Sequence, residues 1–472
     1  MSSEARASAE PSGGGLDEAA AGHPLLARPY KTWLVIVLVA VSTLNFADRA
    51  VLSVLAQAIK EDLKLTDADL GMLQGLGFAI LYSVLGLPLG WLAERVSRKG
   101  LIAVCVAVWS FMTVACGLAG SFITLLLCRV GVGIGEAGAQ PATASLTADH
   151  FKADRRGSIL GITLLGAPFG FLLGQSLGGW VAAQWGWKAA FFALGAPGLV
   201  VALVVALTLR EPPRGLAEGR VTGGPPPAFK AALAELWSKP SFRHLLLAST
   251  ISGFTSNAVA QFVLPFYLRS FGLPLAVVGV LFGTVSLTSN GLGMLAGGFG
   301  FDSLSRRDRR WAMWGPAVVM VVAMPLYAGA FASRTVTLSL ALIWASNFVL
   351  ASCTAPSAAA VQNLVGPRMR AFAAAVYALA IGLVGAGLGP TALGLLSDMF
   401  AGQAFHAGDF LTACPGGRGG AGLDAVCRAA STEGLRHALI SVQVLYVWAA
   451  IHFLLAARTL RRDLHDPQPT PA

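Results

Sequence analysis

Residues 32–55 read TWLVIVLVAVSTLNFADRAVLSVL, an apolar run that carries one acid and one base near its middle. At about 1.5 Å per residue, a helix of this length spans the hydrocarbon core of a bilayer, which is about 30 Å thick. Placing a charged side chain at that depth costs roughly 2.5–3.5 kcal/mol on insertion scales. Asp48 and Arg49 therefore need partners, and another apolar run offers Arg129 and Glu136.

The composition of the chain indicates an integral membrane protein. Of its 472 residues, 55% are hydrophobic and only 12% are charged, and the mean hydropathy is +0.67. Soluble domains average about 25% charged residues, so a soluble globular fold is excluded. The net charge of +10 does not indicate nucleic-acid binding, because proteins with many membrane spans collect Lys and Arg in their cytoplasmic loops. We expect the lipid bilayer as a partner, and no nucleic acid.

Twelve segments are apolar enough to cross the membrane as helices of about 20 residues. They fall into two sets of six, separated by a polar stretch. The sequence therefore predicts an all-α membrane protein with twelve transmembrane helices in two six-helix bundles. The predicted spans are 32–55, 69–92, 99–118, 122–148, 156–183 and 187–209 in the first set, and 243–269, 274–299, 310–331, 336–363, 369–399 and 435–459 in the second.

The distribution of Lys and Arg orients these helices. Loops on the side of the N-terminus carry 24 of these residues, and loops on the opposite side carry 8. By the positive-inside rule, both termini are expected in the cytoplasm. The predicted organisation is a disordered cytoplasmic tail, an N-terminal bundle, a cytoplasmic linker with a short amphipathic helix, a C-terminal bundle and a second tail, at residues 1–31, 32–210, 211–242, 243–462 and 463–472.

An internal repeat relates the two halves. The loop after the second span has a glycine, an acid four residues later, and a basic pair at positions eight and nine; the loop after the eighth span repeats this spacing. Major facilitators are built from two six-helix halves, so the repeat favours that architecture. The residues are Gly90, Glu94, Arg98 and Lys99 in the first loop, and Gly298, Asp302, Arg306 and Arg307 in the second.

These loops resemble the signature after the second and eighth helices of the major facilitator superfamily, although Glu94 stands where the family usually has Asp. Three stretches also resemble the Spinster (Spns) subfamily of lysolipid and sphingolipid transporters. Organic-anion symporters also carry Asn-x-x-Asp-Arg in their first helix, but their fourth helix is not expected to read Gly-Glu-Ala. The stretches are Asn45-x-x-Asp48-Arg49, Gly133-Ile-Gly135-Glu136-Ala137 and Gly394-Leu-Leu-Ser-Asp398.

The charged residues of the first half are expected to meet inside the membrane. Asn45, Asp48 and Arg49 are three and four residues apart and share one helix face, and Arg129 and Glu136 lie two turns apart on another. The rise per residue places Asp48 near the level of Arg129, and Arg49 within reach of Glu136. A static ion network that joins two helices is the structural alternative, but intramembrane ionisable groups usually mark a transport pathway.

We hypothesise that these residues couple substrate to protons. Arg49, Asn45 and Arg129 would bind an anionic substrate group, since the guanidinium fork suits phosphate and carboxylate. Asp48 and Glu136 would carry protons. If Arg49 is shared between Glu136 and the substrate, substrate binding frees Glu136 to take a proton, and the two events become linked.

The loop motifs are expected to act as a gate at the cytoplasmic face. When the transporter faces outward, their charges would tie the helix ends together, while Gly90 and Gly298 let helices approach closely. The alternative is that these charges only set the topology. The predicted gating residues are Gly90, Glu94, Arg95, Arg98, Lys99, Asp302, Arg306 and Arg307.

The second half has no mid-membrane acid or base comparable to those of the first. Its polar residues are candidates either for the cavity lining or for contacts between helices. A charged half facing an apolar half suits an amphipathic ligand. In the loop at 400–434, Cys414 and Cys427 would form a disulfide in an oxidising compartment, or remain free thiols. The candidate lining residues are Asn257, Gln261, Asn290, Ser352, Thr354 and Tyr377.

The function predicted from these features is proton-coupled secondary transport of an amphipathic lipid, lysophospholipid- or sphingolipid-like, by alternating access. The alternative is the same fold moving a small organic anion or a drug. A membrane-bound lipid enzyme is disfavoured, because no HExxH, GxSxG or cluster of metal ligands is present. We expect no cofactor or metal, a monomer, and a multi-pass protein of a bacterial inner membrane.

Overall fold

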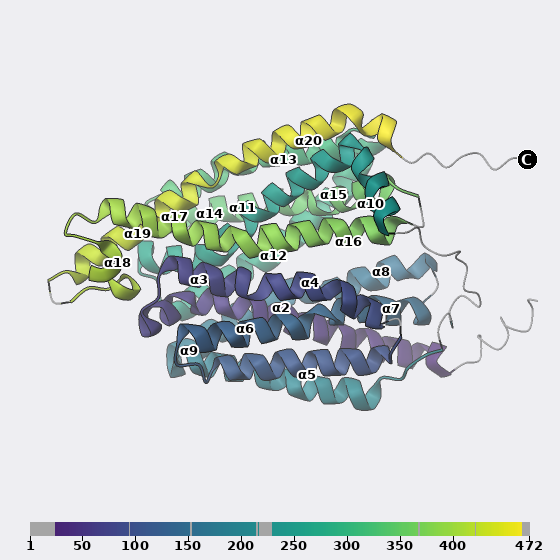
Figure 1. Cartoon of the computed structure of the whole chain (residues 1–472), viewed down its shortest axis with the longest axis horizontal. Helices are drawn as coiled ribbons and strands as arrows, with labels where there is room; N and C mark the ends of the chain where they lie inside the picture. The colour runs from purple at the N-terminus through teal and green to yellow at the C-terminus, as the bar shows by residue number, and fades with distance from the viewer. Residues whose placement is uncertain are drawn as a thin grey trace, which may run out of the picture.

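The computed structural model describes residues 24–464, except 94, 152, 214–215, 217–228, 367–368 and 421. In this part of the chain the secondary structure is helical, without strands. The N-terminal helices, purple to blue, lie together on one side, and the C-terminal helices, green to yellow, lie on the other (Figure 1). The predicted all-α fold with two groups of long helices is confirmed.

The first long helix, α2, begins at Arg28. Pro29 lies in its first turn, where the fixed φ of proline suits the helix. Several predicted spans are made of two helices that meet at a glycine or a short break. The elements are η1 (Pro24–Leu26), α2 (Arg28–Leu63), α3 (Asp67–Gln74), α4 (Leu76–Ala93), α5 (Arg98–Cys116), α6 (Phe122–Ala137), α7 (Ala139–His150), α8 (Ala153–Leu164) and α9 (Gly166–Thr208).

The second half follows the linker helix α10 (Phe229–Ser238), close to the predicted amphipathic helix. Its eleventh span is interrupted by a π-helical segment, η3. The elements are α11 (Pro240–Phe271), α12 (Leu275–Arg307), α13 (Trp311–Ala332), α14 (Val336–Ser352), α15 (Thr354–Asn363), α16 (Arg370–Ala380), η3 (Ile381–Leu388), α17 (Gly389–Ala404), α18 (Phe410–Ala413), η4 (Pro415–Gly417), α19 (Asp424–Ser441) and α20 (Val444–Asp463).

Ten helical stretches of the described chain are long and apolar enough to cross a bilayer. One of them, Ile159–Thr208, has 50 residues and contains a break at Gly186, where φ is 82°, so it holds two spans. α11 has 32 residues and supplies a further span. Every one of the twelve predicted spans therefore corresponds to one, two or three consecutive described helical elements, and α9 contributes to two of them.

The ends of some elements differ from the prediction. The segment 400–434 is not all loop, because α17 continues to Ala404 and α19 begins at Asp424. The first turns of α19 are polar, so an apolar window misses them, yet Cys427, Ala430 and Ser431 are buried at helical spacing. The predicted N-terminal tail loses residues 28–31 to α2, and its first 23 residues lie outside the described part, as do residues 214–215 and 217–228 of the linker.

The two ends of the molecule differ in what lies there. α18 and the start of α19 lie at one end, which we call the disulfide end, and α10 lies at the opposite end, which we call the linker end (Figure 1). At the disulfide end the halves pack directly, α3 on α17 and α9 on α12. A Cβ at Gly394 of α17 would lie 2.1 Å from the carbonyl oxygen of Asp67, so only glycine permits this approach.

Candidate functional site

The predicted meeting of the first and fourth spans occurs between α2 and α6. Arg49 Nε donates to Glu136 Oε2 at 2.7 Å, and Arg49 Nη2 lies 2.7 Å from the same oxygen. The Glu136 side chain is fully buried, whereas the Arg49 side chain is 23% exposed. Asn45 lies on the same face of α2, within hydrogen-bonding reach of Glu136. The ion pair therefore joins a sequestered acid to an arginine that remains open to a cavity.

Asp48 and Arg129 have a different relation. Both are 2% exposed, and their charges interact, but among the described residues they form no direct ion pair. Asp48 Oδ1 and the Nε and Nη1 groups of Arg129 are buried without a hydrogen-bond partner in the described part of the chain. A buried donor or acceptor left unpaired costs about 1–3 kcal/mol, and more when charged. These atoms are therefore available for a ligand, a water molecule or a proton.

Aromatic rings surround the Arg49 guanidinium. Its centre lies 4.7 Å from the ring centroids of both Phe78 and Tyr82, and 5.5 Å from that of Phe46. The Phe78 ring also lies 5.6 Å from the guanidinium centre of Arg129. Such contacts contribute about 0.5–2 kcal/mol each and fix the plane of the guanidinium. These rings therefore help to position the Arg49 guanidinium between Glu136 and the cavity.

A cavity of about 410 Å³ opens beside the arginines, between the two halves. The first half supplies both arginines, and the second half supplies only neutral groups. Both side-chain amide atoms of Gln74 are buried without a hydrogen-bond partner within the described chain. Oε1 of Gln261 is buried without a partner in the same way. The lining residues are Arg49, Leu52, Gln74, Phe78 and Arg129 from the first half, and Asn257, Gln261 and Ala386 from the second.

The sequence interpretation found part of this lining. Asn257 and Gln261 were among its candidates, whereas Gln74, Leu52 and Phe78 were not. Gln74 carried a detectable signal, since it is an uncharged polar residue within an apolar span. Tyr377, another candidate, donates to Ser249 Oγ at 3.0 Å and contributes to helix packing.

A second buried ion cluster lies at the disulfide end, and sequence reasoning missed it. Asp67 accepts from Lys60 Nζ at 2.7 Å, and from Arg269 Nη1 and Nη2 at 2.7 and 2.6 Å. Ser397 Oγ donates to the same carboxylate at 2.7 Å. Because Arg269 and Ser397 belong to the second half, this cluster joins the halves. Lys60 and Arg269 lie near the ends of predicted spans, where the sequence indicates only a topology signal, and the spacing gives no sign that Asp67 pairs with them.

Asp398 completes the closure at this end. Its carboxylate accepts from the backbone N–H groups of Asp67 and Ala68 at 3.0 and 2.8 Å, at the start of α3. A carboxylate at a helix N-terminus is stabilised by the free N–H groups and the helix dipole. The Gly394-Leu-Leu-Ser-Asp398 stretch thus caps a helix of the other half.

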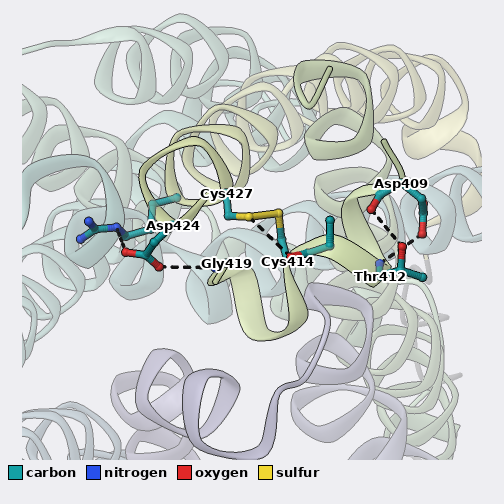
Figure 2. Close-up of a disulfide and its surroundings, with 8 residues drawn as sticks. Asp409, Thr412, Cys414, Gly419, Asp424 and Cys427 are labelled. Carbon is teal, nitrogen blue, oxygen red and sulfur yellow. Dashed lines mark hydrogen bonds and ion pairs between the residues drawn. A yellow bond between two sulfur atoms is a disulfide. The ribbon is translucent and has the colours of Figure 1, made fainter. Parts of the chain in front are cut away.

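A disulfide-closed loop covers the same end. Cys414 and Cys427 are bonded to each other, and the loop between them runs past the end of α2 (Figure 2). Arg418 Nη2 donates to Glu61 Oε2 at 2.9 Å, and a Cβ at Gly416 would lie 2.9 Å from the Lys60 carbonyl oxygen. The loop belongs to the second half but lies on the first, so it adds to the contact between halves.

The loop motif at the linker end forms contacts within the first half. Arg98 is buried and forms ion pairs with Asp149 and with Glu211, the latter at 2.7 Å. The backbone N–H of Lys99 also donates to Glu211, at 3.0 Å. Partial burial raises the pKa of Glu211, but these hydrogen bonds outweigh it and lower the pKa overall. The motif therefore ties the ends of α5, α7 and α9 together.

The other predicted gating residues give less information. Glu94 lies outside the described residues, and the side chain of Asp302 is also outside them. Arg306 and Arg307 are exposed at the end of α12, and Arg95 is exposed just before α5. In the second half, Asp308 accepts from Arg461 at 2.9 Å. The described contacts of these motifs lie within one half, not between the two. A Cβ at Gly298 would meet no described atom within 4 Å, so the predicted close approach of helices at Gly298 is wrong.

Comparison with known proteins places this arrangement in a family. The Major Facilitator Superfamily profile matches residues 38–390. The chain belongs to this superfamily. It is 30% identical over 408 residues to the mouse protein spinster homolog 1, covering 79% of this chain and 74% of that one. It is also 34% identical over 375 residues to an MFS-type efflux pump of Mycolicibacterium smegmatis, covering 78% and 85%.

A solved structure supports the subfamily. The crystal structure of a bacterial homologue of the human lysosomal transporter Spinster, in an inward-facing and unoccupied conformation, matches with a TM-score of 0.84 and 31% identity. The match covers 93% of this chain and 100% of that chain. The predicted membership of the Spinster subfamily is confirmed, and the protein is a multi-pass membrane transporter, not an enzyme.

Proposed function

We propose that this transporter moves an amphipathic lipid with an anionic headgroup, lysophospholipid- or sphingolipid-like, in exchange for or together with protons. The observation that carries the proposal is the cavity between the halves, where Arg49 and Arg129 meet neutral amides. Paired donors on a guanidinium bind phosphate or carboxylate through two parallel hydrogen bonds. Leu52, Phe78 and Ala386 supply apolar surface beside these donors, which favours a ligand with an apolar portion.

Coupling to protons follows from the sharing of Arg49. In the free protein Arg49 neutralises Glu136. An anionic headgroup would draw the guanidinium toward the cavity, and a buried carboxylate without a cation is costly, so Glu136 would take a proton. Asp48, whose Oδ1 has no partner within the described chain, would be the second proton carrier next to Arg129. Substrate and proton binding then stabilise each other.

The lining of the cavity restricts how a lipid would bind. Most of its lining residues are polar, and only Leu52, Phe78 and Ala386 offer apolar surface, so the cavity suits a headgroup better than a long acyl chain. The tail would therefore extend from the cavity along the apolar side of the second half. The headgroup would contact both halves at once, through Arg49 and Arg129 on one side and Asn257 and Gln261 on the other.

Alternating access would use the two ends described above. The Asp67 cluster and the disulfide loop join the halves at the disulfide end, and this closure would make the protein inward-facing, as the matched Spinster homologue is. We place both termini in the cytoplasm of a bacterial cell and the protein in its inner membrane, acting as a monomer. In the outward-facing state the loop motifs, including Glu94 and Asp302, would close the linker end.

A second candidate function is transport of a small organic anion or a drug. The similarity to the mycobacterial efflux pump, which covers 85% of that protein, favours it. The same two arginines would bind the anionic group, but no long tail would be needed. The similarity to a probable galactarate/D-glucarate transporter of Bacillus subtilis covers only 38% of this chain and carries less weight.

Thermal stabilisation of the purified protein by ligands tests these functions. Lysophospholipids, sphingosine phosphate, sugar acids and cationic drugs would be compared, each with wild type and with Arg49→Ala. Stabilisation by a lysolipid that disappears in Arg49→Ala supports lipid transport. Stabilisation by sugar acids or drugs alone rejects the lipid and favours the second candidate. Arg436→Ala, at the disulfide end, is the control for loss of an arginine outside the cavity.

A further inference from the structure

The antiparallel helices α5 and α6 pack so closely that their register can be followed residue by residue. A Cβ at Gly131 would lie 2.7 Å from Met112 Sδ, and one at Gly135 would lie 2.6 Å from the Trp109 backbone nitrogen. Moving one turn along α6, from Gly131 to Gly135, thus corresponds to moving one turn back along α5, from Met112 to Trp109. Small residues at these positions allow the close contact.

Continuing this register by one turn toward the disulfide end brings two cysteines face to face. Cys116, the last residue of α5, is fully buried, and its thiol lies within hydrogen-bonding reach of the thiol of Cys128 in α6. Cys128 is partly exposed. Neither cysteine takes part in the disulfide, and neither is needed for the transport cycle proposed above.

A third sulfur lies one turn away. Met112 is four residues before Cys116 on the same face of α5, so their side chains are neighbours. The Met112 thioether lies over Gly131, which is three residues from Cys128 on α6. The two thiols and the thioether therefore lie on the facing sides of α5 and α6, within about one helical turn of one another.

We propose that Cys116, Cys128 and Met112 form a binding site for a soft monovalent metal ion, Cu⁺ or Ag⁺. Thiolates and thioethers select such ions, whereas Mg²⁺ and Ca²⁺ require oxygen ligands. Structural zinc usually takes four nitrogen or sulfur ligands, and the described residues contain no group of three or more His, Cys, Asp or Glu that could hold a metal. The sulfur set thus fits a two- or three-coordinate ion.

The charges of this site balance. On binding, the two S–H bonds break, two protons leave to solvent, and two metal–sulfur bonds form without any change of oxidation state. The bis-thiolate complex of a monovalent ion carries one negative charge. Arg129 follows Cys128 directly, interacts electrostatically with Cys116, and has unpaired Nε and Nη1 groups. Its positive charge would offset that of the complex.

Binding of the ion has a functional consequence that rests on the proposed function. The negative complex would attract Arg129, which otherwise serves Asp48 and the cavity. Ag⁺ is therefore expected to inhibit substrate transport, and this inhibition should disappear in a variant without the thiol pair. Binding itself does not depend on the substrate, so it can be measured independently.

The test uses the full-length protein in detergent, with silver nitrate in a chloride-free buffer, and measures bound metal by equilibrium dialysis. We expect one tightly bound ion per chain. Cys116→Ser and Cys128→Ser should each weaken binding by about a hundredfold or more, and Met112→Leu by about tenfold, because soft sulfur donors determine the affinity. Cys105→Ser and Cys353→Ser, which remove single buried thiols elsewhere, should bind like wild type.

Thermal unfolding curves of each variant show whether it is folded before its binding is interpreted. If a folded Cys116→Ser or Cys128→Ser variant binds Ag⁺ as tightly as wild type, the site is wrong. A thiol titration in denaturant should find four free thiols, and finding two would mean that the pair is oxidised and would also overturn the proposal. Failure of lipid stabilisation alone would reject the proposed substrate and leave the metal site standing.

Discussion

The two buried ion clusters of this transporter differ in how completely their charges are satisfied. At the disulfide end, Asp67 receives two cations and a hydroxyl, so its carboxylate oxygens are fully used. In the centre, Arg49 neutralises Glu136, but Asp48 and Arg129 keep buried atoms without partners within the described chain. Both clusters are buried, and only the first joins the two halves directly.

This difference indicates that the cluster at the disulfide end stabilises one conformation, whereas the central cluster is suited to bind a ligand. A fully paired buried cluster resists the loss of any member, because the remaining charges would be left unpaired. In a partly paired cluster, buried polar atoms already lack hydrogen-bond partners in the free protein. A ligand that hydrogen-bonds to these atoms removes this energetic penalty. The Asp67 cluster should therefore control the stability of the protein and the opening of the disulfide end. The central cluster should control ligand binding and its coupling to protons.

The largest effect is expected from Asp67→Ala. This variant leaves Lys60 and Arg269 buried without a counter-ion, which should cost about 3–5 kcal/mol. Thermal unfolding in detergent measures the loss. The control is Glu61→Gln, whose partner Arg418 is 44% exposed, so that this change should cost less than about 1 kcal/mol. Equal unfolding temperatures for the two variants would contradict a structural role for the Asp67 cluster.

Glu136→Gln tests the coupling role of the central cluster. The amide keeps the shape but cannot exchange a proton, so substrate binding should remain measurable while a pH gradient no longer drives uptake. Coupled sites typically change each other's affinity about 5–150-fold, and this factor should fall to about one. Uptake into proteoliposomes with and without a gradient is the measurement. Gradient-driven uptake in a folded Glu136→Gln variant would remove Glu136 from the mechanism.

Arg49→Lys separates charge from geometry in the same cluster. Lysine keeps the positive charge but loses the planar fork and the fit between Phe78 and Tyr82. Affinity for an anionic ligand should fall by about tenfold. Isothermal titration gives this value, and Arg436→Lys at the disulfide end is the matched control. Unchanged affinity would mean that Arg49 acts only as a point charge.

Gln74→Leu examines the unpaired amide in the cavity. Replacing it removes a buried polar group without a partner, so the free protein should be as stable as wild type or more stable, by up to about 1–3 kcal/mol. Ligand affinity should fall at the same time. Gln443→Leu, which removes an amide bonded to the Leu439 carbonyl away from the cavity, should leave affinity unchanged. Loss of stability without loss of affinity would contradict a binding role.

The smallest effect concerns the pH dependence of the linker-end motif. The pKa of Glu211 is lowered in the folded protein, so its stabilisation is present above the unfolded pKa and is lost as the pH falls through the folded pKa. Its side chain is 29% exposed, and the contribution should be below about 1 kcal/mol. Glu211→Gln should lower the unfolding temperature at pH 7, and the difference from wild type should vanish under strongly acidic conditions.

Much of the fold could be predicted because a bilayer leaves few alternatives. A spanning segment must satisfy its own backbone hydrogen bonds, so an apolar run of sufficient length becomes a helix. The polar start of α19 was not predicted, because it projects beyond the apolar run. It is stabilised by packing against protein and by the Cys414–Cys427 disulfide. Apolar windows detect burial in lipid, and they do not detect burial against protein.

For the site, sequence spacing indicated that Arg49 and Glu136 could meet, because helix periodicity fixes which residues share a face. Spacing did not indicate that Asp48 and Arg129 would remain without a direct ion pair, since this depends on side-chain positions set by the surrounding helices.

The sequence by itself determined the helices, their two sets of six, the family and the acidic and basic residues buried in the first half. Only the tertiary structure decided which charges are satisfied, that Lys60, Asp67 and Arg269 join the halves, that Gln74 faces the cavity, and that Cys116 lies opposite Cys128. Helix formation depends on neighbours along the chain, whereas these contacts join residues of different helices and depend on how close glycines allow those helices to approach.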